Sequence, residues 1–189
     1  MKPRKQLVSK IYFARHGQSV ANQQAVAAGS QDSPLTEKGI KQAYREANEI
    51  KRRGLKFDTI ITSSLSRACE TARIIARETD YDENRIITSK LLWERNLGSY
   101  EGTSLGTFSD SSESDKEEAG AEKLIELVAR VKRANNFVKQ HALGTTLVVG
   151  HSGFYRMARC IAEGLDPSMT YSLESPKNGV IVEYPLRIS

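Results

Sequence analysis

Short apolar runs alternate with longer amphipathic stretches along this chain, and this alternation limits the fold more than any other feature of the sequence. The runs are rich in Ile, Val, Phe and Tyr, a composition that favours buried β-strands. They occupy residues 10–14, 57–62, 85–92, 145–149 and 180–184. Because strands that alternate with helices typically build one sheet between helical layers, the sequence predicts an α/β fold.

Between the runs, apolar residues recur with the spacing of an α-helix, at residues 40–50, 65–76, 124–138 and 154–161. The first of these stretches follows Thr36, a suitable N-cap, and ends at Gly54. Residues 103–120 break the pattern, because they are rich in Ser, Asp and Glu and poor in apolar side chains. We expect this segment to be a mobile acidic surface loop.

The length and composition suit a single domain over residues 1–189, since the chain is 39% hydrophobic and 27% charged. No stretch approaches 18 consecutive apolar residues, and no long apolar segment follows the charged N-terminus. We therefore expect no membrane span, no secretion signal and a cytoplasmic protein. Residues 1–9 are expected to form a flexible basic tail.

The formal net charge of +5 comes partly from that tail and partly from a basic helix end at residues 51–53. The chain has no basic stripe interleaved with aromatic residues, so we expect neither nucleic acid nor a membrane as a partner. Cys69 and Cys160 lie far apart in helical stretches, which predicts two packed, reduced thiols.

Side chains with catalytic potential follow four of the apolar runs. In chain order they are Arg15 with His16, Arg67, Glu94 and His151. If these strands run parallel, their carboxyl ends meet at one edge of the sheet, where open α/β sheets place their ligands. The sequence therefore predicts a single site at that edge.

This set of side chains suits phosphoryl transfer. Arg15, Arg67 and His151 can surround a phosphoryl group and neutralise its oxygens. His16 can attack phosphorus, and Glu94 can protonate the leaving oxygen and later deprotonate a water molecule. A metal site is the rival interpretation of two His and one Glu, but two guanidinium groups would repel a divalent cation, and HxH or HExxH spacing is absent. We expect no metal and no cofactor.

Five motifs together resemble those of the histidine phosphatase superfamily, the phosphoglycerate mutase-like proteins, over roughly residues 10–184. They read RHGQSVAN at 15–22, DSPLTEKG at 32–39, SSLSRA at 63–68, ERNLGSYEG at 94–102 and GHSG at 150–153. The resemblance implies a three-layer α/β/α sandwich with a mostly parallel central sheet.

The resemblance also implies roles for individual residues. It makes His16 the phosphorylated nucleophile, Glu94 the proton donor, and Arg15, Arg67 and His151 the phosphate pocket. Further candidates for phosphate or substrate contacts are Gln18, Ser19, Asn22 and Ser152. For Gln18 and Ser19, a purely structural role in the loop beside the nucleophile is an equally good interpretation.

Within the superfamily the sequence favours a phosphatase over a cofactor-dependent phosphoglycerate mutase. The resemblance implies that such mutases are longer and carry paired arginines in a segment inserted after the acid motif. The matching residues 103–120 are acidic and contain no arginine, which makes them a poor host for a bisphosphorylated acid. A mutase also needs a closed cover over its phosphoenzyme, whereas a short polar loop leaves the site open to water.

We therefore predict a metal-independent phosphomonoester phosphatase that acts on small phosphorylated metabolites through a phosphohistidine. The alternatives are a cofactor-dependent phosphoglycerate mutase and a non-catalytic module that only binds phosphate. The motifs recognise phosphate and do not identify the rest of the substrate, and the sequence does not indicate an oligomeric state.

Overall fold

The computed structural model describes residues 10–186, and the predicted basic tail at residues 1–9 lies outside them. Within the described residues five strands form one sheet, in the order β3-β2-β4-β1-β5. Their bounds are β1 (Lys10–Arg15), β2 (Thr59–Ser63), β3 (Ile87–Ser89), β4 (Thr145–Gly150) and β5 (Ile181–Glu183). Strands β1 to β4 run parallel, whereas β5 pairs antiparallel with β1 at one edge. The expected mostly parallel sheet is confirmed.

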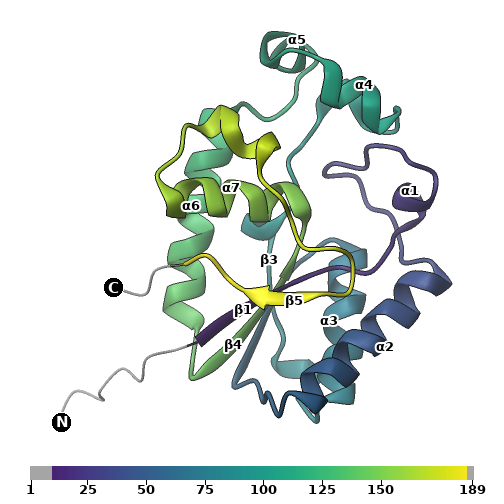
Figure 1. The fold of residues 1–189 in the computed structure, drawn as a ribbon, viewed down its shortest axis with the longest axis vertical. Helices are drawn as coiled ribbons and strands as arrows, with labels where there is room; N and C mark the ends of the chain where they lie inside the picture. Colours follow the sequence, from purple (N-terminus) through teal and green to yellow (C-terminus); the bar gives the residue numbers. More distant parts are fainter. Residues whose placement is uncertain (1–9, 187–189) are drawn as a thin grey trace.

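Helices cover both faces of the sheet and give the expected three layers (Figure 1). One layer holds α2 (Glu37–Arg52) and α3 (Ser66–Glu78), and the other holds α6 (Leu124–His141) and α7 (Ser152–Glu163). Successive strand residues point to opposite faces. Tyr12 and Leu147 therefore join the apolar cluster under α2 and α3, whereas Phe13 and Val148 join the cluster under α6 and α7.

Shorter helices lie in the connections. They are α1 (Val20–Gln23), α4 (Leu105–Asp110), α5 (Glu113–Glu118) and the 3₁₀ turns η1 (Glu83–Arg85), η2 (Lys90–Leu92), η3 (Gly98–Tyr100) and η4 (Pro167–Ser172). As predicted, Thr36 caps α2, since its Oγ1 accepts a hydrogen bond from the Gly39 N–H at 3.0 Å. Cys69 and Cys160 are free thiols. None of the helices in residues 10–186 combines the length and apolar character that a membrane span requires.

Two sequence-based expectations need correction. The run at residues 85–92 contains only the short strand β3, because one-turn 3₁₀ helices occupy both of its ends. Residues 103–120 are not an irregular loop but fold into α4 and α5, which we call the cover (residues 105–118) and which lies at one end of the molecule (Figure 1). The cover folds because Phe108 and Lys116 are buried and because Ser112 and Asp115 form a capping box at the start of α5. The mobility expected for this segment stays a prediction.

Candidate active site

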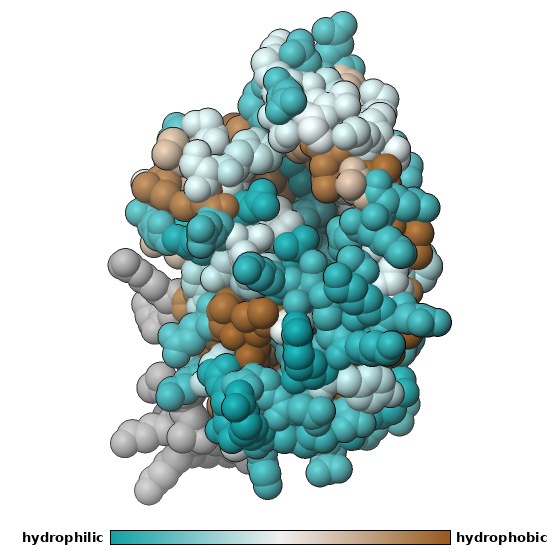
Figure 2. Space-filling view, turned by 45° about the vertical axis from the view of Figure 1, so that its right-hand side comes forward, coloured by the Kyte–Doolittle hydropathy of each residue, from teal (hydrophilic) through white to brown (hydrophobic). Residues whose placement is uncertain are grey.

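A cavity of about 390 Å³ lies between the carboxyl ends of the parallel strands and the cover. The space-filling view shows the surface hollowed beneath the cover, with hydrophobic residues exposed on both sides of the hollow (Figure 2). Most of the predicted site residues line this cavity: Arg15, His16, Ser19, Asn22, Arg67, Glu94 and Ser152. These residues therefore meet at the carboxyl edge of the sheet, where the sequence predicts a site.

His16 follows β1 directly and is held by the backbone on both sides. Its N–H donates to the Gly150 carbonyl at 3.1 Å, and its ring Nδ1 lies 2.6 Å from the Gly17 carbonyl oxygen. Because a carbonyl oxygen only accepts hydrogen bonds, Nδ1 must carry the proton, which leaves the lone pair on Nε2. Burial, followed by the charges of Arg67 and Arg15, holds the pKa of His16 well below 6.5. The ring is therefore neutral at neutral pH, as a nucleophile requires.

Gly17 is required at the next position by a close approach of two backbone segments. A Cβ atom on this residue would lie 2.3 Å from the carbonyl oxygen of Gly39 at the start of α2. The Gly17 N–H also donates to Thr71 Oγ1 on α3 at 3.1 Å. The turn after β1 is thus fixed against both helices of one layer, and this fixes the direction of the neighbouring His16 ring.

Arg67 and Arg15 bring two guanidinium groups to the cavity. Arg67 is 98% buried and donates to the carbonyls of Gly29 and Gln31, each at 2.8 Å. Arg15 donates to the Pro176 carbonyl at 3.3 Å, and its buried Nε has no hydrogen-bond partner among the described residues. Burial lowers the pKa of both arginines, and the Glu94 carboxylate opposes that shift. Both remain cations suited to phosphate oxygens.

His151 lies behind His16 rather than on the cavity wall. It is fully buried, its ring centroid is 5.1 Å from that of His16, and its Nε2 lies 2.8 Å from Ser63 Oγ. Burial, followed by Arg67, His16 and Arg15, holds its pKa well below 6.5. Its buried Nδ1 has no partner among the described residues. When it carries the ring hydrogen, Nδ1 is a buried donor beside two arginines, and a bound anion would complete it by accepting that hydrogen bond.

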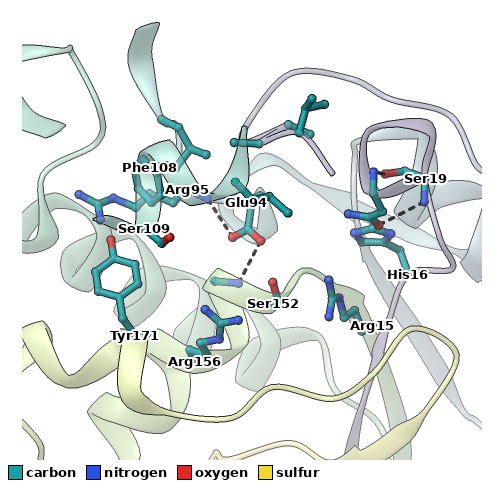
Figure 3. Close-up of a pocket in the computed structure, with 18 of the residues that line it drawn as sticks. Arg15, His16, Ser19, Glu94, Arg95, Phe108, Ser109, Ser152, Arg156 and Tyr171 are labelled. Atoms are coloured by element: carbon teal, nitrogen blue, oxygen red, sulfur yellow. Dashed lines mark hydrogen bonds between the residues drawn. The ribbon is translucent and has the colours of Figure 1, made fainter. Parts of the chain in front are cut away.

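Glu94 is fixed at the start of α7 by backbone donors (Figure 3). Its Oε1 accepts from the N–H groups of Arg95 and Phe154, each at 3.0 Å, and its Oε2 accepts from the Gly153 N–H at 2.9 Å. A Cβ atom on Gly153 would come within 2.5 Å of Oε1, so this close approach requires glycine. Because Oε2 accepts only one hydrogen bond, it retains a lone pair that can hold a proton.

Two loop candidates contact each other as well as the cavity. The Asn22 N–H donates to Ser19 Oγ at 3.3 Å, and the Ser19 N–H donates to Asn22 Oδ1 at 3.2 Å, which caps α1. Gln18 does not line the cavity. Its Oε1 accepts from Thr36 Oγ1 at 3.0 Å, and its N–H donates to Gln42 Oε1 at 2.7 Å. Its contacts are therefore those of a loop residue that positions the turn.

The wall away from His16 contains residues that the sequence did not single out. They are Arg95, Phe108, Ser109, Arg156 and Tyr171 (Figure 3). Arg95 directly follows Glu94, and Arg156 lies three residues after the last motif, so a search around the motifs could have found both. No pattern marked Phe108 or Tyr171, because each is placed by contact with a distant part of the chain.

Salt bridges and aromatic rings attach the cover to this wall. Glu113 on α5 pairs with Arg95 at 3.0 Å and with Lys116 at 2.9 Å. Both cations are buried and lie 4.5–5.8 Å from the ring centroids of Phe108 and Tyr171. Such cation–π contacts strengthen when the cation is desolvated. Among the described residues no three His, Cys, Asp or Glu side chains gather in a way that could hold a metal ion.

Known proteins share both sequence and fold with this chain. A 2,3-bisphosphoglycerate-dependent phosphoglycerate mutase of Parvibaculum lavamentivorans is 40% identical over 92 residues, which are 49% of this chain and 44% of that protein. The chain thus matches less than half the length of that relative. The α-ribazole phosphatase of Shigella flexneri superposes with a TM-score of 0.74 at 22% identity, covering 91% of this chain and 88% of its own.

A phosphoserine phosphatase of Entamoeba histolytica, in complex with 3-phosphoglyceric acid, superposes equally well. Its TM-score is 0.74 at 23% identity, and the match covers 92% of this chain and 89% of that one. At such identities the two structural matches establish the fold. The family model of the histidine phosphatase superfamily (branch 1) matches residues 11–184. The chain therefore belongs to the histidine phosphatase superfamily, whose relatives include both phosphatases and mutases.

Proposed function

We propose that this chain is a phosphomonoester phosphatase that acts on small phosphorylated metabolites through a phosphohistidine at His16, without a metal ion. One observation carries the proposal. The His16 ring is buried beside two arginines with its Nδ1 hydrogen fixed on the Gly17 carbonyl, so a neutral ring presents Nε2 to the cavity. The substrate is a small phosphomonoester, and neither nucleic acid nor a membrane takes part.

In the first step the phosphoryl group is held by Arg15, Arg67 and His151. His16 Nε2 attacks phosphorus, and the bond between phosphorus and the ester oxygen breaks. Glu94 gives its proton to that departing oxygen, so a neutral alcohol leaves. In the second step Glu94 takes a proton from a water molecule, whose oxygen attacks phosphorus. The phosphorus–nitrogen bond breaks, inorganic phosphate leaves, and His16 returns to its starting form.

A phosphatase fits the chain better than a mutase on the character of the cover. The cover contains no arginine, and five of its residues are acidic against one lysine, which disfavours a substrate with two phosphates. The two structural neighbours described above are phosphatases.

A mutase remains the second candidate because of one specific observation. Residues expected to form an open loop instead form two helices, of which α4 lines the cavity through Leu105, Phe108 and Ser109. A cover of this kind would help to keep water from a phosphoenzyme. The sequence relative described above, a phosphoglycerate mutase, also favours a mutase.

The experiment is hydrolysis of p-nitrophenyl phosphate in EDTA by the wild type, His16→Ala and His141→Ala. His141 is a matched control, because it lies at the far end of α6 and packs on Phe137. We expect turnover in chelator, full activity of His141→Ala and loss of activity in His16→Ala. Full activity of His16→Ala would contradict the mechanism.

A parallel assay separates the alternatives. The wild type is given 3-phosphoglycerate primed with 2,3-bisphosphoglycerate, and both phosphate release and 2-phosphoglycerate are measured. Isomerisation faster than hydrolysis would identify a mutase. Binding of inorganic phosphate without turnover of either ester would identify a binding module.

A further inference from the structure

A third arginine, Arg156, lines the same cavity as Arg15 and Arg67. It forms no hydrogen bond or ion pair with any other residue in 10–186, and its Nε is buried without a partner. Of the other arginines near this site, Arg130 pairs with Glu122 at 2.6 Å, and Arg95 pairs with Glu113, a carboxylate that it shares with Lys116. Arg156 is thus a guanidinium group aimed into the cavity with no described residue to neutralise it.

The position of Arg156 in the cavity suits a contact with the leaving group of the substrate rather than with its phosphoryl group. In Figure 3 its guanidinium lies between Ser152 and Tyr171, on the opposite side of Ser152 from Arg15 and His16. It follows Ser152 by four residues and Gly153 by three on α7, so the three share one helix face. A substrate with its phosphorus at His16 and its ester oxygen near Glu94 would extend its remaining atoms towards Arg156.

Charge matching indicates what Arg156 binds. A phosphomonoester dianion is balanced by Arg15 and Arg67, and Glu94 must be protonated to serve as the acid. Farther along the cavity wall, Arg156 is the guanidinium group with no carboxylate partner among the described residues, and such a planar group binds a carboxylate through two parallel hydrogen bonds. A second phosphoryl group would bring two further negative charges to this single guanidinium. Phe108 and Tyr171 line the cavity beyond Arg156, on the side away from His16.

We propose that Arg156 is a specificity-determining residue that binds a carboxylate on the leaving group, so that the preferred substrates are phosphate esters of hydroxy acids. This inference rests on the proposed phosphatase function. It predicts that a carboxylate on the substrate improves turnover through Arg156 and that this gain disappears when the guanidinium is removed.

The test uses two esters that differ mainly in one group, 3-phosphoglycerate and glycerol 3-phosphate, with phosphate release as the readout. Four proteins are compared: wild type, Arg156→Gln, Arg156→Lys and the control Arg159→Gln. Arg159 lies on the same helix but is paired with Glu163 at 2.8 Å outside the cavity. We expect the wild type to prefer the carboxylate ester at least about tenfold in kcat/KM, as one charge-assisted bidentate contact allows.

Arg156→Gln should reduce that preference at least about tenfold, mainly through a higher KM for the carboxylate ester. Arg156→Lys, which keeps the positive charge, should retain part of that preference. Arg159→Gln should leave kcat/KM unchanged on both esters. If the glutamine variant fails to fold, as judged by its thermal transition, the lysine variant still reports the preference. A partial loss of the preference in Arg156→Lys supports the proposal, and an unchanged preference contradicts it.

Other outcomes overturn the inference while leaving the proposed function intact. An equal loss on both esters would mean that Arg156 only supports Glu94 or Arg15. A wild type that hydrolyses p-nitrophenyl phosphate but shows no carboxylate preference would remove the basis of the proposal. Preference for glycerol 1,3-bisphosphate over 3-phosphoglycerate would assign Arg156 to a second phosphate instead. A wild type that hydrolyses none of these esters would contradict the proposed function itself.

Discussion

The two ends of the cavity are held in place by different kinds of contact. At the phosphate end, which comprises Arg15, His16, Arg67 and His151, the side chains follow strand ends and bond largely to backbone carbonyls. At the leaving-group end, which comprises Arg95, Arg156, Tyr171 and the cover, contacts between side chains attach the cover to Arg95 and Tyr171, whereas Arg156 has no partner among the described residues. The first end depends on the parallel sheet, and the second depends on a few ionic and aromatic contacts.

Under the proposed function, this difference separates the residues that carry out the chemical steps from those that select the substrate. A reacting group must stay within a fraction of an ångström of its position, and a hydrogen-bonded sheet provides that rigidity. A substrate-recognising wall can change with the side chains that build it, because no strand depends on them. We therefore expect substitutions at the phosphate end to reduce turnover, and substitutions at the leaving-group end to alter stability or substrate choice.

The largest effect should come from a matched pair of buried arginines, Arg67→Lys and Arg95→Lys. Arg67 donates to two carbonyls and also faces the cavity, a geometry that the single ammonium of lysine does not reproduce. We expect kcat/KM to fall by about 10³-fold in Arg67→Lys. Arg95→Lys keeps a positive charge beside Glu113, so its kcat/KM should fall by less than about tenfold.

Steady-state kinetics on p-nitrophenyl phosphate, with the thermal transition of each variant, checks this pair. Equal losses of kcat/KM in the two variants would remove the distinction between the two ends of the cavity.

The next largest effect on turnover should come from Glu94, which lies between the two ends of the cavity. Glu94→Gln keeps the shape and, with its amide oxygen in the place of Oε1, the two bonds from the Arg95 and Phe154 N–H groups, but it loses the bond from the Gly153 N–H and the transferable proton. We expect turnover of an alkyl phosphate to fall by about 10²-fold, the usual contribution of a general acid. Turnover of p-nitrophenyl phosphate, whose leaving group needs no protonation, should fall much less. Equal slowing of both esters would exclude Glu94 as the acid.

The same division explains how much the sequence predicts. Arg67 and His151 follow β2 and β4, and the rule that ligands bind at the carboxyl ends of parallel strands brought both to the site without any knowledge of contacts. Motif order then matched their roles to a known superfamily. The phosphate end was predictable because its geometry follows from local sequence and the topology of the sheet.

The leaving-group end was not predictable for a physical reason. The cover has a polar composition typical of a loop, and its helices are stabilised by contacts that Phe108 and Lys116 make with Tyr171, far along the chain. Likewise, nothing in the sequence near Arg156 shows that it lacks a partner. Whether a cation is neutralised depends on side chains that only the fold brings together.

A smaller effect is expected from His16 and His151 on how the free energy of unfolding changes with pH. Burial holds the pKa of His16 and His151 well below 6.5 in the folded protein. Below pH 6.5 the unfolded chain therefore binds protons that the folded protein does not, so stability falls on acidification. Between pH 6.5 and 5.5 each ring should remove about 1 kcal/mol from the free energy of unfolding.

Denaturant unfolding of the wild type and His151→Gln at these two pH values measures this loss. The variant should lose about 1 kcal/mol less than the wild type, because it has one titrating ring fewer. Glu46, whose pKa burial raises to about 8, favours the folded state on acidification in this range. It is present in both proteins and cancels in the comparison. An equal loss in the two proteins would mean that His151 is not buried in its neutral form.

The smallest effect tests the cover itself. Glu113→Gln leaves the buried cations Arg95 and Lys116 without their shared carboxylate, which should cost about 1 kcal/mol because Glu113 is itself partly exposed. The matched control Glu117→Gln lies on the same short helix and loses only an exposed pair with Lys123, worth less than about 0.5 kcal/mol. The midpoints of thermal unfolding of the two variants should differ by about 2–4 °C.

The same variant tests whether the cover takes part in substrate binding. If the cover depends on these side-chain contacts, Glu113→Gln should bind substrate less well, so KM should rise while the turnover of bound substrate changes little. If kcat falls instead, the cover contributes to the geometry of the phosphate end, and the two ends of the cavity act as one unit.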